Sequence, residues 1–156
     1  MASSQAEAAE KQEGDKNQDV LFYVLNSTDP QSREAFLSKL LNKVYKEQRL
    51  CDVRFESEQD ALRYDLTLWN YQATSFIPHS VANQATASIQ LHGEEINKPN
   101  KDVLVNLHPK FPDLFKGYQR TIEILDQSEY LIQMGRERWK TYKELGIEPT
   151  VHKIGF

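Results

Sequence analysis

The chain has 156 residues, of which 39% are hydrophobic and 27% charged, and this length suits one domain with an ordinary core. Its formal net charge of −4 argues against a protein that wraps duplex DNA, which requires a strong basic face. The single cysteine, the absence of a secretory signal pattern and the absence of an apolar run long enough to cross a bilayer predict a soluble cytoplasmic protein without disulfides or membrane contact.

Residues 1–19 form the first compositional segment. They contain five acidic residues, two lysines and no aromatic residue. Such a segment cannot bury enough apolar surface to offset the entropy of ordering. We therefore expect a disordered acidic N-terminal extension over residues 1–19, followed by a single domain over residues 20–156.

The first half of that domain alternates strand and helix patterns. "VLFYVL" (20–25) is a buried strand pattern, and Asp29 with Pro30 can begin the helix that follows. "CDVRF" (51–55) is a second strand, in which Cys51 is expected to be buried. Ser57 resembles the start of a capping box for a second helix. The order predicts a right-handed β-α-β unit with parallel strands.

The second half contains more strand patterns than helix patterns. The extended candidates are "SFIPHS", "ASIQL", "DVLVNL" and "RTIEIL". A closing helix is expected to begin at Ser128 and to end near Gly146. The sequence therefore predicts an α/β protein with three α/β/α layers and a mostly parallel, mixed sheet.

The residues needed for nucleotide binding or catalysis are missing. Folds of this type bind nucleotides after the first strand, but "LNSTDPQS" at that place has no glycine, and no phosphate-loop motif occurs elsewhere. The four histidines have no metal-ligand spacing and are expected to lie in loops. We expect no metal, no cofactor and no catalytic residue.

The closing helix carries cations beside an aromatic residue, in "GRERWKTYKELG" (135–146). At 100° per residue, the core-facing stripe holds Leu131, Met134, Gly135, Tyr142 and Leu145. Arg138 falls in the same stripe, so we expect it to pair with a carboxylate or to reach the edge of the core. One flank of the helix combines Ile132, Arg136, Trp139 and Lys143, and Lys140 lies opposite the core.

Two interpretations of this flank remain open. The cations can be an ordinary solvated surface, with Trp139 half-covering the core. Alternatively, they can form a pocket for a ligand that is both anionic and apolar, because arginine grips a carboxylate and tryptophan packs against a ring. An acidic peptide ending in a hydrophobic residue fits, as does single-stranded nucleic acid. The nearly neutral body of the chain favours the peptide.

Four segments within residues 20–145 carry a family resemblance: "LFYVLN", "DALRYDLTLWNYQATSFIPHSVA", "DVLVNL" and "GRERWKTY". Together they resemble the chi subunits of bacterial DNA polymerase III. The resemblance implies an α/β/α fold related to nucleotide-binding folds, without a phosphate loop and without catalytic activity. It also implies an adaptor that joins the psi subunit of the clamp loader to the acidic, phenylalanine-terminated tail of single-stranded-DNA-binding protein. The alternative is a nucleotide-binding protein or a direct binder of single strands.

The resemblance also implies a tail-binding site. Arg136 aligns with the family arginine expected to hold the terminal carboxylate, and Trp139 stands where a tyrosine is usual. Lys140 would attract the acidic residues, and Leu125 would form the floor. Ile132 replaces a frequent lysine, a charge for which Lys143 could compensate.

A second implied site is the surface that faces psi. The resemblance assigns Trp69 and Phe76 to it, although a Phe-Ile pair before Pro78 is more often part of a buried strand. A repair helicase is a further candidate partner for this surface, and little direct DNA binding is expected.

Overall fold

The structure is a computed structural model that describes residues 18–71, 78–81 and 87–156. The strands are β1 (Asp19–Leu25), β2 (Cys51–Arg54), β3 (His79–Val81), β4 (Ile89–His92), β5 (Val103–Asn106), β6 (Arg120–Leu125) and β7 (Thr150–Ile154). The helices are α2 (Pro30–Lys46), α3 (Glu58–Trp69) and α4 (Glu129–Glu144), and η1 (Asp113–Gly117) is a short 3-10 helix.

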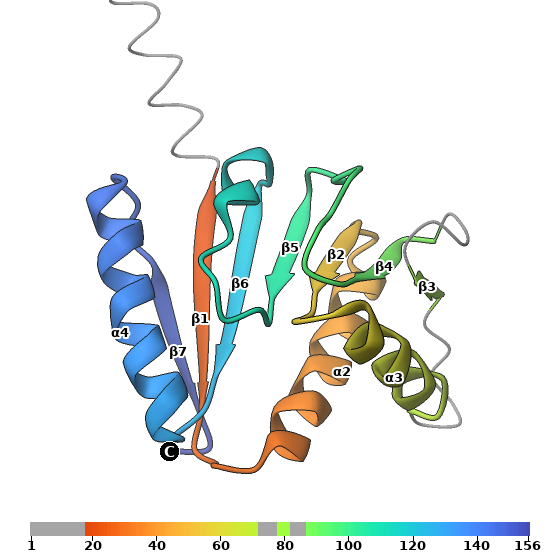
Figure 1. Cartoon of the computed structure of the whole chain (residues 1–156), viewed down its shortest axis with the longest axis horizontal. Coiled ribbons are helices and arrows are strands. Elements are labelled where there is room, and N and C mark those ends of the chain that lie inside the picture. Colours follow the sequence, from red (N-terminus) through yellow and green to blue (C-terminus); the bar gives the residue numbers. More distant parts are fainter. Residues whose placement is uncertain (1–17, 72–77, 82–86) are drawn as a thin grey trace, which may run out of the picture.

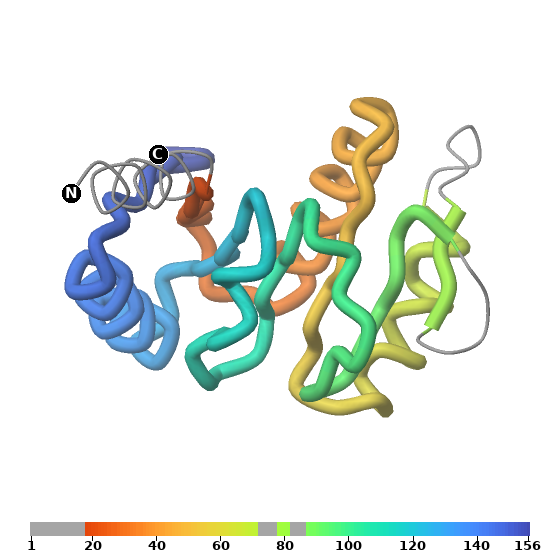
Figure 2. The backbone as a smooth tube through the Cα atoms, turned by 90° about the horizontal axis from the view of Figure 1, so that it is seen from above, coloured from red at the N-terminus to blue at the C-terminus, as the bar shows by residue number. Residues whose placement is uncertain are grey.

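The strands form one seven-stranded sheet in the order β3-β4-β2-β5-β6-β1-β7. Every pairing in this sheet is parallel, so the expectation of a mixed sheet is replaced by a parallel one. Figure 1 shows the strands side by side, with α4 next to β7 at one end, and Figure 2 shows α2 and α4 on opposite sides of the sheet. The predicted three-layer α/β/α fold is confirmed.

Two main hydrophobic clusters hold the layers together. The larger one lies between the sheet and the helices α2 and α3, and it includes Leu37, Leu41 and Tyr64. The second lies under α4 on the other face and includes Phe22 and Tyr142. Alternate residues of β1 enter the two clusters, as expected for a strand covered on both faces.

The predicted helix starts are confirmed at α2 and α3 and differ in detail at α4. Asp29 accepts a hydrogen bond from the Gln31 amide at 3.0 Å, and the Ser57 hydroxyl accepts one from the Asp60 amide at 3.1 Å. Ser128 occupies the N-cap position of α4, but its hydroxyl donates to Asp126 Oδ1 at 2.6 Å. The carboxylate therefore orders the turn that leads into α4.

Some sequence expectations are wrong. Asp19, expected in the disordered extension, is the first residue of β1, and residues 1–17 lie outside the described part of the chain. Leu145 is 44% exposed rather than in the core, because α4 ends one residue earlier. The strand β7 was not anticipated at all.

The histidines were expected in loops, but three of the four lie in strands. His79 is in β3, His92 in β4 and His152 in β7, whereas His108 follows β5 in a loop. His92 lies 2.9 Å from buried Asp52, and His152 stacks on Tyr23 at 5.3 Å between ring centroids. Within the described residues, no three metal-ligating side chains gather into a metal site, and no helix is long and apolar enough to cross a membrane.

Candidate functional site

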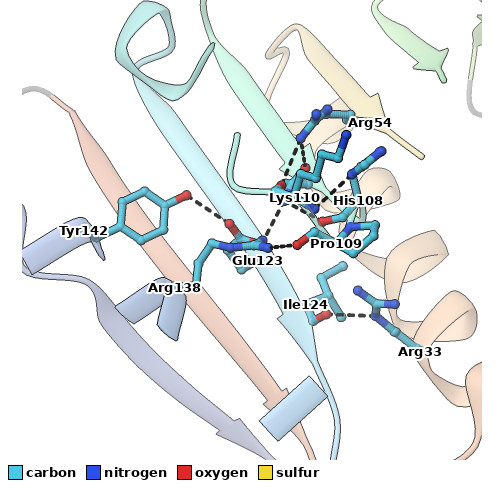
Figure 3. A network of polar contacts seen from close by, with 10 residues as sticks. Arg33, Arg54, His108, Pro109, Lys110, Glu123, Ile124, Arg138 and Tyr142 are labelled. Atoms are coloured by element: carbon cyan, nitrogen blue, oxygen red, sulfur yellow. Dashed lines mark hydrogen bonds and ion pairs between the residues drawn. The ribbon is translucent and has the colours of Figure 1, made fainter. Parts of the chain in front are cut away.

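A buried ion pair anchors α4 to the sheet. Arg138 of α4 donates from Nη1 to Glu123 Oε1 of β6 at 2.8 Å, and Arg138 Nη2 donates to the Pro109 carbonyl at 2.5 Å. Tyr142 donates to the other oxygen of Glu123 at 2.9 Å, and the Asn106 amide donates to Oε1 at 3.2 Å. Figure 3 shows Arg138 and Tyr142 converging on Glu123. The prediction that Arg138 pairs with a carboxylate is confirmed.

This network continues through Asn106 toward the carboxyl end of β2. Arg54 donates to Asn106 Oδ1 at 3.1 Å and to the Glu94 and Lys110 carbonyls at 2.8 and 3.1 Å. Burial raises the pKa of Glu123, and the charge of Arg138 opposes that rise. No buried side-chain nitrogen or oxygen among the described residues lacks a hydrogen-bond partner. The network is therefore a structural support that fixes the position of α4.

A pocket of about 520 Å³ lies between α4 and β7, in the size range of ligand sites. It sits at the edge where the parallel strands end, since Leu125 closes β6 there and α4 begins beyond it. In α/β sheets, ligands bind outside this carboxyl edge. The part of α4 from Leu131 to Trp139 forms one wall of the pocket, and β7 forms the other.

Four predicted tail-binding residues line this pocket together: Leu125, Ile132, Arg136 and Trp139. Leu125 is buried, whereas Arg136 is exposed. Trp139 is half-buried, with its ring edge-on to Phe22 at 6.0 Å between centroids. Within the described part of the chain, Arg136 makes no ion pair. Its guanidinium is thus available to an anion above an apolar floor.

The other two predicted cations do not line the pocket. Lys140 is exposed on α4 outside the lining residues. Lys143 lies over the Trp139 ring, 5.7 Å from its centroid, and its ammonium is 3.8 Å from Glu148. Lys143 therefore contacts the Trp139 ring and does not line the cavity.

The pocket contains residues that sequence reasoning missed, in and after β7: Val151, Lys153 and Phe156. The β7 sequence TVHKI is exposed at every position, so no buried face marked it as a strand. A smaller signal was present at Gly135. A side chain there would place Cβ 2.6 Å from Leu125, so glycine allows α4 to approach the pocket floor.

A second surface lies on α3, where three large apolar side chains are exposed one turn apart. Leu62 is 49% exposed, Leu66 65% and Trp69 50%. The Trp69 ring packs at 4.4 Å from the His79 ring, between centroids. Phe76, the other residue assigned to this surface, lies outside the described residues. Sequence reasoning expected a helix after Ser57 but did not recognise the exposed stripe that Leu62 and Leu66 form with Trp69.

The place where a nucleotide would bind in related folds offers little room. The pocket beside Pro30 and Phe55, at the carboxyl edge near β2, measures about 150 Å³, below the usual range of ligand sites. Its lining includes Arg63 and Glu34, whose side chains are paired at 2.5 Å. Arg63 is thus paired with Glu34, and Arg33, the other cation that lines this pocket, donates from Nε to the Ile124 carbonyl at 2.8 Å.

Comparison with known proteins identifies the family. Residues 18–150 match the family described as "DNA polymerase III chi subunit, HolC". The chain is 27% identical to DNA polymerase III subunit chi of Pseudomonas aeruginosa over 134 residues, which cover 85% of this chain and 94% of that protein. It is 25% identical to the same subunit of Haemophilus influenzae over 139 residues, covering 86% and 96% of the two chains. With the subunit of Escherichia coli it shares 28% identity over 96 residues, covering 59% and 65%. The chain therefore belongs to the family of DNA polymerase III chi subunits.

Proposed function

We propose that this chain is a non-catalytic adaptor of the DNA polymerase III holoenzyme. In this proposal, it joins the psi subunit of the clamp loader to the acidic C-terminal tail of single-stranded-DNA-binding protein. Membership of the chi-subunit family supports an accessory role in DNA replication. The observation that carries the finer proposal is the pocket between α4 and β7, in which Arg136, which has no ion-pair partner among the described residues, stands beside Trp139 over an apolar floor.

The chemistry of the pocket fits a peptide end. The Arg136 guanidinium can donate two parallel hydrogen bonds to a terminal carboxylate. Trp139 and Leu125 supply the apolar and aromatic surface that a terminal phenylalanine ring would cover. Lys140, exposed further along α4, would attract acidic residues that precede the phenylalanine.

Calorimetric titration with an acidic peptide ending in phenylalanine tests this site. Arg136→Ala should weaken binding by about 1.5–3 kcal/mol, the scale of hydrogen bonds to charged groups. Removal of the terminal phenylalanine from the peptide should abolish most of the affinity. Lys39→Ala, an exposed lysine on α2 in the opposite layer, is the matched control and should bind as the unaltered chain does. The proposed site would be contradicted if the chain bound a scrambled acidic peptide with equal affinity. It would also be contradicted if the Arg136→Ala variant bound the phenylalanine-terminated peptide as tightly as the unaltered chain does.

The exposed stripe on α3 supports the second half of the proposal. Large apolar side chains that remain exposed on a monomer are typical of interface centres. We assign Leu62, Leu66 and Trp69 to the psi-facing surface together with Phe76. Leu66→Glu should abolish copurification with a psi subunit while leaving tail-peptide affinity unchanged, because α3 and α4 lie in different layers.

Direct binding of single strands by the α4 flank is the alternative function. Arg136 and Lys140 would then contact phosphates, and Trp139 would stack on a base. An oligonucleotide titration at ~0.15 M salt separates the two functions. Oligonucleotide affinity equal to or above the peptide affinity would favour the alternative.

A further inference from the structure

The strand β7 forms half of the pocket, and its pairing with β1 decides which of its side chains enter. Phe22 pairs with Val151 and Val24 with Lys153, and paired residues of parallel strands point to the same face. Phe22 packs against Trp139 and Tyr142 of α4. Val151 and Lys153 therefore face α4, whereas His152 stacks on Tyr23 on the other face. Lys153 enters the pocket because of this register.

Most of the cations of α4 do not contribute positive charge to the pocket. Arg138 is buried against Glu123, and Lys143 is held beside Glu148 and Trp139. Position 132, which lines the pocket one turn before Arg136, carries an uncharged isoleucine. Among the described residues that line the pocket, Arg136 and Lys153 are the two cations, and they stand on opposite walls.

Asp126 is the one residue with an acidic side chain among the lining residues that the structure describes, and its position must be reconciled with an anionic ligand. Asp126 is 3% exposed, and its Oδ1 accepts hydrogen bonds from the Ser128 amide at 2.9 Å and the Ser128 hydroxyl at 2.6 Å. These donors lie at the start of α4, where the helix dipole stabilises a negative charge. The Ser128 donors of its own turn thus stabilise Asp126, and a ligand carboxylate would be attracted to Arg136 and Lys153 instead.

We propose that Lys153 of β7 is a specificity-determining residue of the tail pocket and supplies, with Arg136, the charge that holds the carboxylate of a peptide ending in an aromatic residue. This inference rests on the proposed tail-binding function. Lys153 is exposed, and its ammonium lies over the ring of Phe156, another residue that lines the pocket, at 5.7 Å from the ring centroid. Within the described chain no acidic side chain pairs with it. The ring of the ligand would lie between Trp139 and Val151.

Arg136 and Lys153 would bind a ligand carboxylate in different ways. The planar guanidinium of Arg136 fixes the direction of the carboxylate, and the ammonium of Lys153 acts as a mobile point charge. Lys153 should therefore discriminate between a free carboxylate and a neutral chain end more than it discriminates between side chains. A change at the pocket rim should also alter the salt dependence of binding.

Calorimetry with two peptides tests the inference. Both peptides are acidic and end in phenylalanine, one with a free carboxylate and the other amidated. Lys153→Met should weaken binding of the free-carboxylate peptide about 3- to 10-fold, between the effects typical of an exposed ion pair and of a charge-assisted hydrogen bond. It should leave binding of the amidated peptide nearly unchanged, so the ratio of the two affinities should shrink. Lys39→Met, on α2, is the matched control and should behave as the unaltered chain.

A double variant that places the positive charge on α4 instead of β7 separates the loss of charge from any local damage to β7. The double variant Ile132→Lys/Lys153→Met returns the cation to the pocket from the α4 wall, so it should recover most of the affinity lost by Lys153→Met. Loss of affinity for both peptides alike, or no difference between Lys153→Met and Lys39→Met, would overturn the role of Lys153. If the unaltered chain binds neither peptide, both this inference and the proposed function fail; if it binds and Lys153→Met has no effect, only this inference fails.

Discussion

Replacing Arg138 by methionine tests whether the buried ion pair with Glu123 holds α4 on the sheet. The side chains of Arg138 and Glu123 are 4% and 1% exposed, and the variant would leave Glu123 with only its neutral partners, Asn106 and Tyr142. It would also remove the donor that satisfies the Pro109 carbonyl. Breaking one side of a buried pair costs about 3–5 kcal/mol, so we expect a loss of that size in the free energy of unfolding at pH 7.5. Urea unfolding followed by circular dichroism measures it.

The loss of stability in Arg138→Met should also depend on pH, in a direction that follows from the pKa of Glu123. Burial raises the pKa of Glu123, and Arg138 is the largest influence that lowers it again. Without Arg138 the pKa in the folded state should rise further above the unfolded value of about 4.3. A carboxyl group with a raised pKa binds a proton more tightly in the folded state than in the unfolded state. Stability therefore falls as the pH rises from the unfolded-state pKa to the folded-state pKa. The deficit of Arg138→Met should therefore shrink as the pH is lowered from 7.5 toward 5.

A double variant completes the test. Glu123→Gln/Arg138→Met removes the stranded charge, so it should be more stable at pH 7.5 than Arg138→Met alone. The reasoning is refuted if Arg138→Met costs less than about 1 kcal/mol, or if the double variant is no more stable than the single one.

Three further predictions concern single positions. Gly146→Ala should cost about 1–2 kcal/mol in a thermal unfolding measurement because its φ is +87°, whereas Gly117→Ala, where a Cβ likewise meets nothing within 4 Å and φ is not positive, should cost clearly less. Ser57→Ala should cost about 1 kcal/mol in urea unfolding, because the hydroxyl caps α3; a change below about 0.3 kcal/mol would show that the cap is unimportant. Cys51 should not react with a thiol reagent in the folded chain and should react fully in urea, because burial raises the pKa of its thiol; rapid reaction of the native protein would contradict its burial.

The layers of the fold could be predicted from the sequence because local signals agree with the final packing. The caps at Asp29 and Ser57 and the apolar stripe of α2 mark helices in any tertiary context. Strand direction has no comparable local signal. The strands at 89–92 and 103–106 are each four residues long, and their parallel pairing with β2 depends on crossovers that the residue pattern does not encode.

The pocket could be predicted only in part, for a related reason. The α4 flank follows from helical periodicity, so Arg136 and Trp139 were placed correctly side by side. The opposite wall depends on a strand whose residues are all exposed. Such a strand lacks the alternation of apolar and polar residues that reveals strands in sequence, and its place beside β1 follows from long-range pairing alone. That Lys153 lines the pocket could therefore be found only from the structure.

The position of β1 between β6 and β7 has a consequence for how the chain folds during synthesis. The side chain of Asp19 pairs with Arg120, 101 residues later, so β1 leaves the ribosome well before either neighbour exists. At 5–20 residues per second, the delay is roughly 5 to 20 s. During this interval the hydrophobic strand VLFYVL has no hydrogen-bonded neighbour, and a chain stalled before residue 120 would expose an aggregation-prone edge. Completion of this end of the sheet should therefore be a late folding event on the ribosome.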